Sequence, residues 1–384
     1  MITRRLLVGT LVAILTGLSL VAAPVVAQTE RSSAPATGRP KPSPALWASP
    51  KTPWGDPDLE GVWTSDSALT IPLERPAQFA GRSELSEAEY QQRVERDART
   101  RRAAENAIGS FRADTAWLNK SFRQTSLIVE PVDGKIPRVT SQAEARRAPR
   151  DEGTFGDGPF DRPEDFTLYD RCITRGIVGS VLPVIYGNGN RILQTPNQVV
   201  ITYEMVHDTR VIPLDGRPHI GQSIRQYLRD SRGHWEGNTL VVETTNLTDK
   251  TSIGSNGNGL RHSAEMKLTE RFTRTDRDVL RYEVTIDDPQ TYTRPWKILL
   301  PLTSPAGFYL LPYECHEGNH AVSNALSAER AEDKALEDDA KRGIVRSRRR
   351  VQELSIIQTV GDDSALVPLL QEESPLPSEA PRGR

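Results

Sequence analysis

The chain has 384 residues, of which 49 are Lys or Arg and 51 are Asp or Glu, giving a formal net charge of -2. This near balance provides no strong positive field, which argues against nucleic acid as a partner. The sequence also lacks a P-loop, a dinucleotide fingerprint and a G-x-S-x-G elbow. Nucleotide-dependent and α/β-hydrolase chemistry is therefore disfavoured, and we expect no cofactor.

The first residues have the layout of a secretory signal peptide. Arg4 and Arg5 precede an uncharged, mostly apolar run over residues 6–23, and small residues follow up to Ala27. This order predicts a signal peptide over residues 1–27. A retained membrane anchor is the alternative, but the run is near the lower length limit for a spanning helix. The twin arginines leave open which export route is used. We expect a periplasmic or secreted protein, without membrane contact after cleavage.

Composition divides the rest of the chain into four parts. Residues 28–50 are rich in Pro, Ser, Ala and Thr, which predicts a disordered linker, and residues 361–384 have the character of a disordered tail. Between them, residues 51–165 predict an N-terminal segment with short strands and a charged helix. Residues 166–360 predict an antiparallel β domain with a late helix.

Within the N-terminal segment, turn residues and aromatics over 54–64 predict a short strand. Ser86 and Glu89 have the spacing of a capping box, and the Glu, Arg, Gln and Ala that follow favour an exposed helix to about residue 107. Residues 126–140 are expected to be extended around a turn.

The β domain alternates apolar and polar residues with a period of two, which is typical of half-buried strands. Because most connections are too short for helical crossovers, we expect a mainly β fold, an antiparallel meander that closes into a barrel-like or strongly curved sheet with peripheral helices. A helix is predicted at 321–341, and residues 351–360 are expected to supply a final strand. The other predicted strands are 199–205, 209–214, 239–246, 263–274, 279–287, 296–303 and 307–315.

The two cysteines, Cys172 and Cys315, are predicted to form a disulfide. An exported protein meets an oxidising compartment, where cysteines pair readily. Two free thiols, or a nucleophilic cysteine, are the alternatives. A bond would tie the segment that enters the sheet to the strand that leaves it.

Several segments resemble an uncharacterised family of secreted bacterial proteins of unknown function. Together they span most of the chain from residue 51 to 320. The resemblance implies export but carries no activity. The segments are WGDPDLEGVW at 54–63, RCITRG at 171–176, YEMVHD at 203–208, IPLDGRPH at 212–219, WEGNTLVVETTN at 235–246 and CHEGN at 315–319.

Three polar side chains fall on the apolar faces of predicted strands. The alternation places Tyr203 and His207 with apolar residues on one strand, and Glu270 with apolar residues on another. If the sheet closes, these three side chains share its interior, where a carboxylate either pairs with a cation or acts as a general acid. They are our candidate catalytic residues, and an internal salt bridge from Glu270 to an arginine is the alternative.

Charged residues crowd the hairpin that follows the Tyr203 strand. Arg210, Asp215, Arg217 and His219 are candidate ligand-binding residues, because ligands often contact the loops at strand ends. Solvation of a hairpin tip explains the same density of charge.

The sequence His316-Glu317-Gly318-Asn319-His320 fits the H-E-x-x-H zinc template. That template requires one helix through both histidines, whereas Gly318 and Asn319 are poor helix formers and no third ligand is evident. We expect His316 to precede the helix, and therefore predict no metal site. His316 and His320 remain the alternative zinc ligands.

These observations favour an exported β protein that binds a small organic ligand. Cofactor-independent acid-base chemistry, as a lyase, isomerase or hydrolase, would suit Tyr203, His207 and Glu270. The alternatives are a zinc-dependent hydrolase and a non-catalytic binding or assembly module with a filled interior. The sequence decides neither whether the protein is an enzyme nor its oligomeric state.

Overall fold

The computed structural model describes residues 47–105, 117–146, 160–184, 186–228, 230–254 and 261–347. The expected signal peptide, most of the linker, the final strand at 351–360 and the tail lie outside these ranges. In the ranges that are described, no helix has the length and apolar character needed to cross a membrane.

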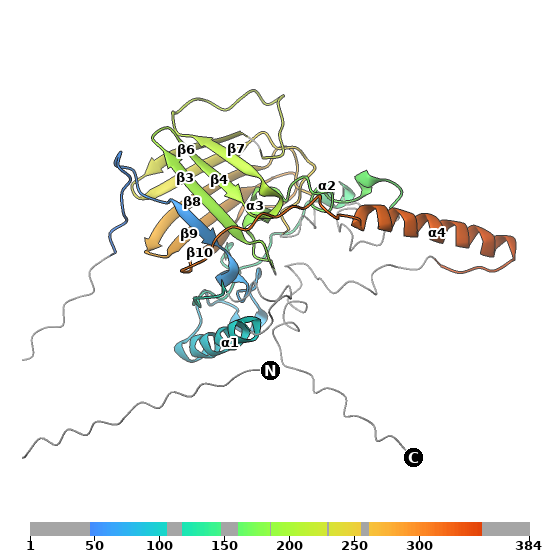
Figure 1. Ribbon diagram of the computed structural model, residues 1–384, viewed down its shortest axis with the longest axis horizontal. Helices are drawn as coiled ribbons and strands as arrows, with labels where there is room; N and C mark the ends of the chain where they lie inside the picture. The colour runs from blue at the N-terminus through green and yellow to red at the C-terminus, as the bar shows by residue number, and fades with distance from the viewer. Residues whose placement is uncertain are drawn as a thin grey trace, which may run out of the picture. The chain divides into compact units, whose positions relative to one another are not determined.

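The described strands form a single ten-stranded sheet in which the neighbouring strands of the main path pair antiparallel (Figure 1). Their order is β5-β4-β3-β1-β10-β9-β8-β7-β6, and β2 pairs with β10 beside this path. The prediction of a mainly antiparallel β fold is confirmed. The strands are β1 (Gly61–Thr64), β2 (Ile128–Glu130), β3 (Gly189–Thr195), β4 (Gln198–Tyr203), β5 (Thr209–Pro213), β6 (Asp230–Glu236), β7 (Thr239–Thr245), β8 (Lys267–Asp276), β9 (Val279–Asp287) and β10 (Trp296–Thr303).

The sheet consists of two meanders joined by the N-terminal strand. Strands β3 to β5 form one meander and β6 to β10 form the other, with each strand paired to its sequence neighbour. Strand β1 lies between them, with Gly61 opposite Ile192 of β3 and Thr64 opposite Thr303 of β10. Strands from both sides of residue 165 therefore belong to one sheet.

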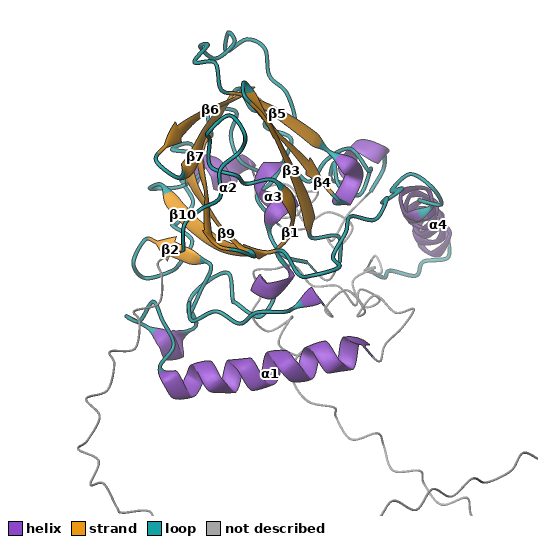
Figure 2. Ribbon diagram, turned by 60° about the vertical axis from the view of Figure 1, so that its left-hand side comes forward, coloured by secondary structure: helices purple, strands orange, loops and turns teal. Residues whose placement is uncertain are grey.

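The sheet curls until its two edge strands approach each other, but it does not close into a barrel (Figure 2). At this seam, a Cβ added to Gly233 of β6 would lie 2.9 Å from Ile212 of β5 and 2.7 Å from Leu214. Side chains thus fill the space in which β5 and β6 would otherwise pair. The strongly curved sheet was predicted correctly, whereas closure into a barrel was not.

One predicted strand is wrong. Residues 307–315 form an irregular loop with a turn at each end, where the Phe308 N–H donates to the Pro305 carbonyl and the Cys315 N–H donates to the Tyr313 carbonyl. Tyr309 and Leu311 are 62% and 56% exposed, so their apolar alternation marks no buried face. Strands β3 and β6 were not predicted. Strand β6 has few apolar residues, and it forms through its tight hairpin with β7.

Both long helices occur where they were predicted. The capping box is present, since the Ser86 N–H donates to Glu89 Oε2 at 2.8 Å. The late helix packs Leu326 against Phe160 and Phe166. The α-helices are α1 (Glu87–Glu105), α2 (Ser141–Arg146), α3 (Ile177–Val181) and α4 (Ala321–Lys341), and the 3-10 helices are η1 (Asp66–Ala68), η2 (Ala77–Phe79), η5 (Pro163–Asp165) and η6 (Met205–His207).

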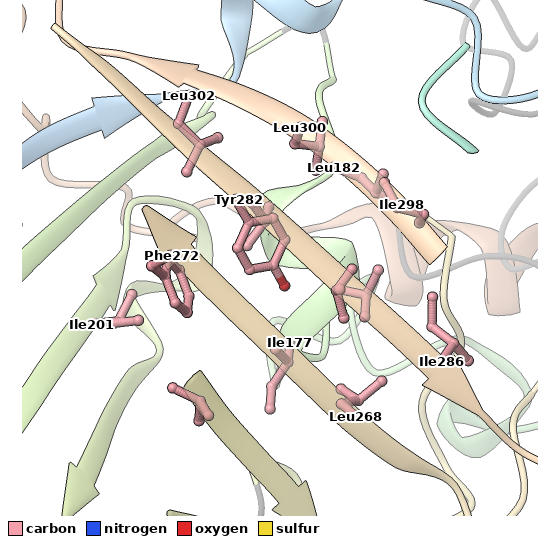
Figure 3. Close-up of a cluster of buried hydrophobic side chains, with 14 of the residues drawn as sticks. Ile177, Leu182, Ile201, Leu268, Phe272, Tyr282, Ile286, Ile298, Leu300 and Leu302 are labelled. Atoms are coloured by element: carbon pink, nitrogen blue, oxygen red, sulfur yellow. The ribbon is translucent and has the colours of Figure 1, made fainter. Parts of the chain in front are cut away.

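The concave side of the sheet is filled by the short helix α3, whose five residues are all buried. Figure 3 shows Ile177 and the neighbouring Leu182 among inward side chains of β8, β9 and β10, including Tyr282. Helix α3 also lies close to the loop that follows β7, since a Cβ added to Gly179 would lie 2.8 Å from the Gly254 carbonyl oxygen. The interior in which we expected a ligand is therefore packed with the protein's own side chains.

Candidate functional site

Arg210 and Glu270 form a buried ion pair between β5 and β8. The guanidinium donates two hydrogen bonds to the carboxylate, at 2.5 and 2.9 Å, and the two side chains are 2% and 0% exposed. Strand alternation explains the geometry, because Thr209 and Val211 point outward and Arg210 points inward. The Tyr282 hydroxyl donates to Glu270 Oε1 at 3.1 Å. Glu270 thus has the internal salt bridge that was our alternative interpretation.

The electrostatics of this cluster keep Arg210 charged and Tyr282 protonated. Burial lowers the pKa of Arg210, but the Glu270 carboxylate, together with Tyr203 and Tyr282, raises that pKa, so it ends above its ordinary value. Burial raises the pKa of Tyr282 well above its ordinary value, so its hydroxyl stays a donor. The group therefore joins β5 to β8 as a structural network.

Tyr203 and His207 do not share a face. Strand β4 ends at Tyr203, and the chain then turns with left-handed φ angles of 64° at Val206 and 43° at His207. Tyr203 is 1% exposed and interacts electrostatically with Arg210, whereas His207 is exposed. The expected juxtaposition of Tyr203, His207 and Glu270 is thus incorrect, because the turn ends the alternation on which it depended.

The four candidate ligand-binding residues also separate. Arg210 is buried in the sheet, while Arg217 forms an exposed ion pair with Asp215, with Nε at 2.7 Å from Oδ2. His219 lies with Nδ1 at 2.7 Å from Oδ2 of Asp230. The expected cluster at the hairpin tip is therefore not formed, because the inward face of β5 takes Arg210 away from it.

The H-E-x-x-H segment does not lie on a helix. Helix α4 begins at Ala321, His320 is its N-cap, and the Asn319 N–H donates to the His316 carbonyl in the preceding turn at 3.3 Å. The prediction that His316 precedes the helix is confirmed. Across the described ranges, no group of three His, Cys, Asp or Glu side chains is placed to hold a metal ion.

The predicted disulfide between Cys172 and Cys315 is present, with 5.6 Å between the Cα atoms. It joins the segment before α3 to the loop between β10 and α4. Beside it, Asn319 Nδ2 donates to the Asp170 carbonyl at 3.0 Å and lies 3.1 Å from Cys172 Sγ. Two segments 143 residues apart are thereby held together.

A surface pocket of about 390 Å³ lies at this junction, and we call it the disulfide pocket. The hydroxyl of Tyr169, one of its lining residues, donates to Met205 Sδ at 3.7 Å. The lining residues are Tyr169, Asp170, Tyr313, Glu314, Cys315, Glu317, Gly318 and Asn319.

Two of the lining residues, Tyr169 and Tyr313, contact a buried arginine and a third tyrosine that do not line the pocket. The Arg175 guanidinium is 5.5 Å from the centre of the Tyr169 ring, and the Tyr186 and Tyr313 rings are 6.3 Å apart. Burial lowers the pKa of Arg175 to about 10, which leaves it charged at neutral pH. Burial also raises the pKa of Tyr169 and of Tyr313, so both hydroxyls stay protonated. The pocket is therefore lined by two tyrosines with neutral hydroxyls, together with the acidic residues Asp170, Glu314 and Glu317.

Three tyrosines with a raised pKa predict a marked loss of stability in alkali. Burial raises the pKa of Tyr169, Tyr282 and Tyr292, so above about pH 10 the unfolded chain loses these protons and the folded protein keeps them. The free energy of unfolding should then fall by about 1.4 kcal/mol per pH unit for each such tyrosine. Phenolate absorbance in native and urea-unfolded protein checks this. Ionisation of all nine tyrosines in one step, with unchanged circular dichroism, would contradict it.

Sequence reasoning missed Tyr169, Arg175, Tyr186 and Tyr313 as site residues. They lie outside the β strands of the structure, and the predicted strand over 307–315, which would have included Tyr313, does not form. The predicted disulfide was the available signal, because it brings the two walls of the pocket together.

No protein-family model, no curated protein and no solved structure matches this chain.

Proposed function

We propose that the protein is an exported β protein that binds a small organic ligand in the disulfide pocket. The observation that carries the proposal is the pocket itself, about 390 Å³ in volume and lined by Tyr169 and Tyr313 together with polar groups. Sites for small molecules commonly combine such a volume with aromatic walls and a few polar side chains. The interior that contains Tyr203 and Glu270 is not the proposed ligand site, because α3 and the ion pair of Glu270 fill it, and His207 lies outside it, exposed.

The pocket is held in shape before any ligand arrives. The Cys172 to Cys315 bond joins its walls, and the Asn319 side chain donates across the same junction. In the loop that carries Tyr313, the Leu311 N–H donates to Glu204 Oε1 at 3.2 Å. A site that needs little ordering on binding loses less affinity to conformational entropy.

Export is part of the proposal. The disulfide fits an oxidising compartment, and a signal peptide over residues 1–27 would deliver the chain to the periplasm or the medium. The resemblance to an uncharacterised secreted family points in the same direction. Acid-base catalysis stays a prediction.

The test is ligand-observed NMR with a panel of neutral, cationic and anionic six- to eight-carbon fragments. We expect at least one fragment to bind, and Tyr313→Ala to weaken it by about tenfold through the loss of an aromatic wall. Tyr309→Ala is the matched control, because Tyr309 lies on the same loop, is 62% exposed and does not line the pocket. The proposal fails if no fragment binds, or if both substitutions weaken binding equally.

A further inference from the structure

The charge of the disulfide pocket is one-sided. Its lining includes three carboxylates, from Asp170, Glu314 and Glu317, and no Lys, Arg or His. Glu314 and Glu317 are exposed, and within the described ranges neither side chain forms a hydrogen bond or an ion pair. Asp170 accepts hydrogen bonds from the N–H and the hydroxyl of Thr167. Two carboxylates therefore remain available to a ligand.

The buried arginine does not reverse this sign. Arg175 is 1% exposed and does not line the pocket, and its guanidinium lies 5.5 Å from the Tyr169 ring centre. For these four side chains, the one positive charge of Arg175 and the three carboxylates sum to -3 + 1 = -2. The potential at the mouth of the pocket favours a positive ligand.

The aromatic walls define the ligand further. Tyr169 and Tyr313 are both partly exposed, and a cation over the face of an aromatic ring is attracted by the ring's negative face. A bare metal ion would instead require three closely placed ligating groups, which the described ranges do not provide. The tyrosine rings and the disulfide are apolar surfaces, and the carboxylates are negative. Together they suit a cation that carries apolar groups.

We infer that the ligand of the disulfide pocket is an organic cation, an ammonium group with apolar substituents. This inference rests on the proposed function and names the chemical class of its ligand. The carboxylates of Glu314 and Glu317 select the charge, and the rings of Tyr169 and Tyr313 contact the apolar substituents.

The test compares three probes of the same shape: choline, its neutral counterpart 3,3-dimethylbutan-1-ol and the anion 3,3-dimethylbutanoate. We expect choline to bind at least about tenfold more tightly than the alcohol, and the anion to bind most weakly. The double variant Glu314→Gln/Glu317→Gln should weaken choline by about tenfold and leave the alcohol unchanged. Added salt should weaken choline alone.

The matched control is Glu84→Gln/Glu95→Gln, which removes two exposed carboxylates outside the pocket and should leave choline binding unchanged. Equal binding of choline and the alcohol, with both sensitive to Tyr313→Ala, would overturn the inference while the proposed function stands. Preferred binding of the anion at this pocket would overturn it as well. If no probe shows binding that depends on Tyr313, and the wider fragment panel also fails, the proposed function falls too.

Discussion

Replacing Glu270 by glutamine is expected to lower the free energy of unfolding by about 3–5 kcal/mol, although it replaces only one carboxylate oxygen by an NH2 group. The substitution leaves the Arg210 guanidinium buried without its carboxylate, and Nε of that guanidinium has no hydrogen-bond partner among the described residues. Removing one member of a buried pair costs more than the pair contributes, because the remaining charge stays desolvated. Urea denaturation monitored by circular dichroism measures the loss.

Two further variants separate this effect from a general effect of charge. Glu236→Gln breaks an exposed pair with Arg271, the residue next to Glu270 on β8, and should change the free energy of unfolding far less than Glu270→Gln does. Arg210→Met/Glu270→Leu removes both buried charges and should cost less than Glu270→Gln alone. An equal loss for Glu270→Gln and Glu236→Gln would show that the buried pair is not the source of stability.

Strong local patterns made much of the sheet predictable. Strands β9 and β10 begin and end at the predicted residues, because buried apolar side chains recur at every second position along both strands. Helix α4 also has its predicted limits. Its run of Ala, Glu, Lys and Leu has high helix propensity.

The predictions that failed concern residues at which the alternation of apolar and polar side chains stops, or charged residues that lie on an apolar strand face. The assignment of His207 required β4 to continue past Tyr203, but two left-handed residues end the strand. Arg210 shares the inward face of β5 with Ile212, a signal that was present in the sequence. Its partner Glu270 also stood among apolar residues, so two opposite charges on apolar faces were the clue to their pairing.

The disulfide pocket was beyond sequence reasoning for a different reason. Its walls are turns and loops, whose backbone follows from long-range contacts rather than from a repeating pattern. The cysteine pairing was the single long-range restraint that could be predicted, and it located the junction without showing the tyrosines around it.

Removing the disulfide is expected to cost about 2–5 kcal/mol of stability and to abolish the pocket while the sheet remains folded. Loss of the bond raises the conformational entropy of the unfolded chain, which for a separation of 143 residues corresponds to about 5 kcal/mol. The loop between β10 and α4 has no strand or helix of its own. Without the bond, its Tyr313 wall is held by exposed contacts such as Leu311 to Glu204.

The variant Cys172→Ala/Cys315→Ala tests both effects at once. Far-ultraviolet circular dichroism should keep its β signal at ambient temperature, since the paired strands do not include the loop, while binding of the best fragment should fall at least about tenfold. Dithiothreitol should have the same effect on the unaltered protein: two electrons and two protons convert the S–S bond to two thiols, and the reagent becomes a cyclic disulfide. The variant itself, which has no bond to reduce, is the control for side effects of the reagent. Undiminished fragment binding after complete reduction would show that the other contacts hold the pocket without the disulfide.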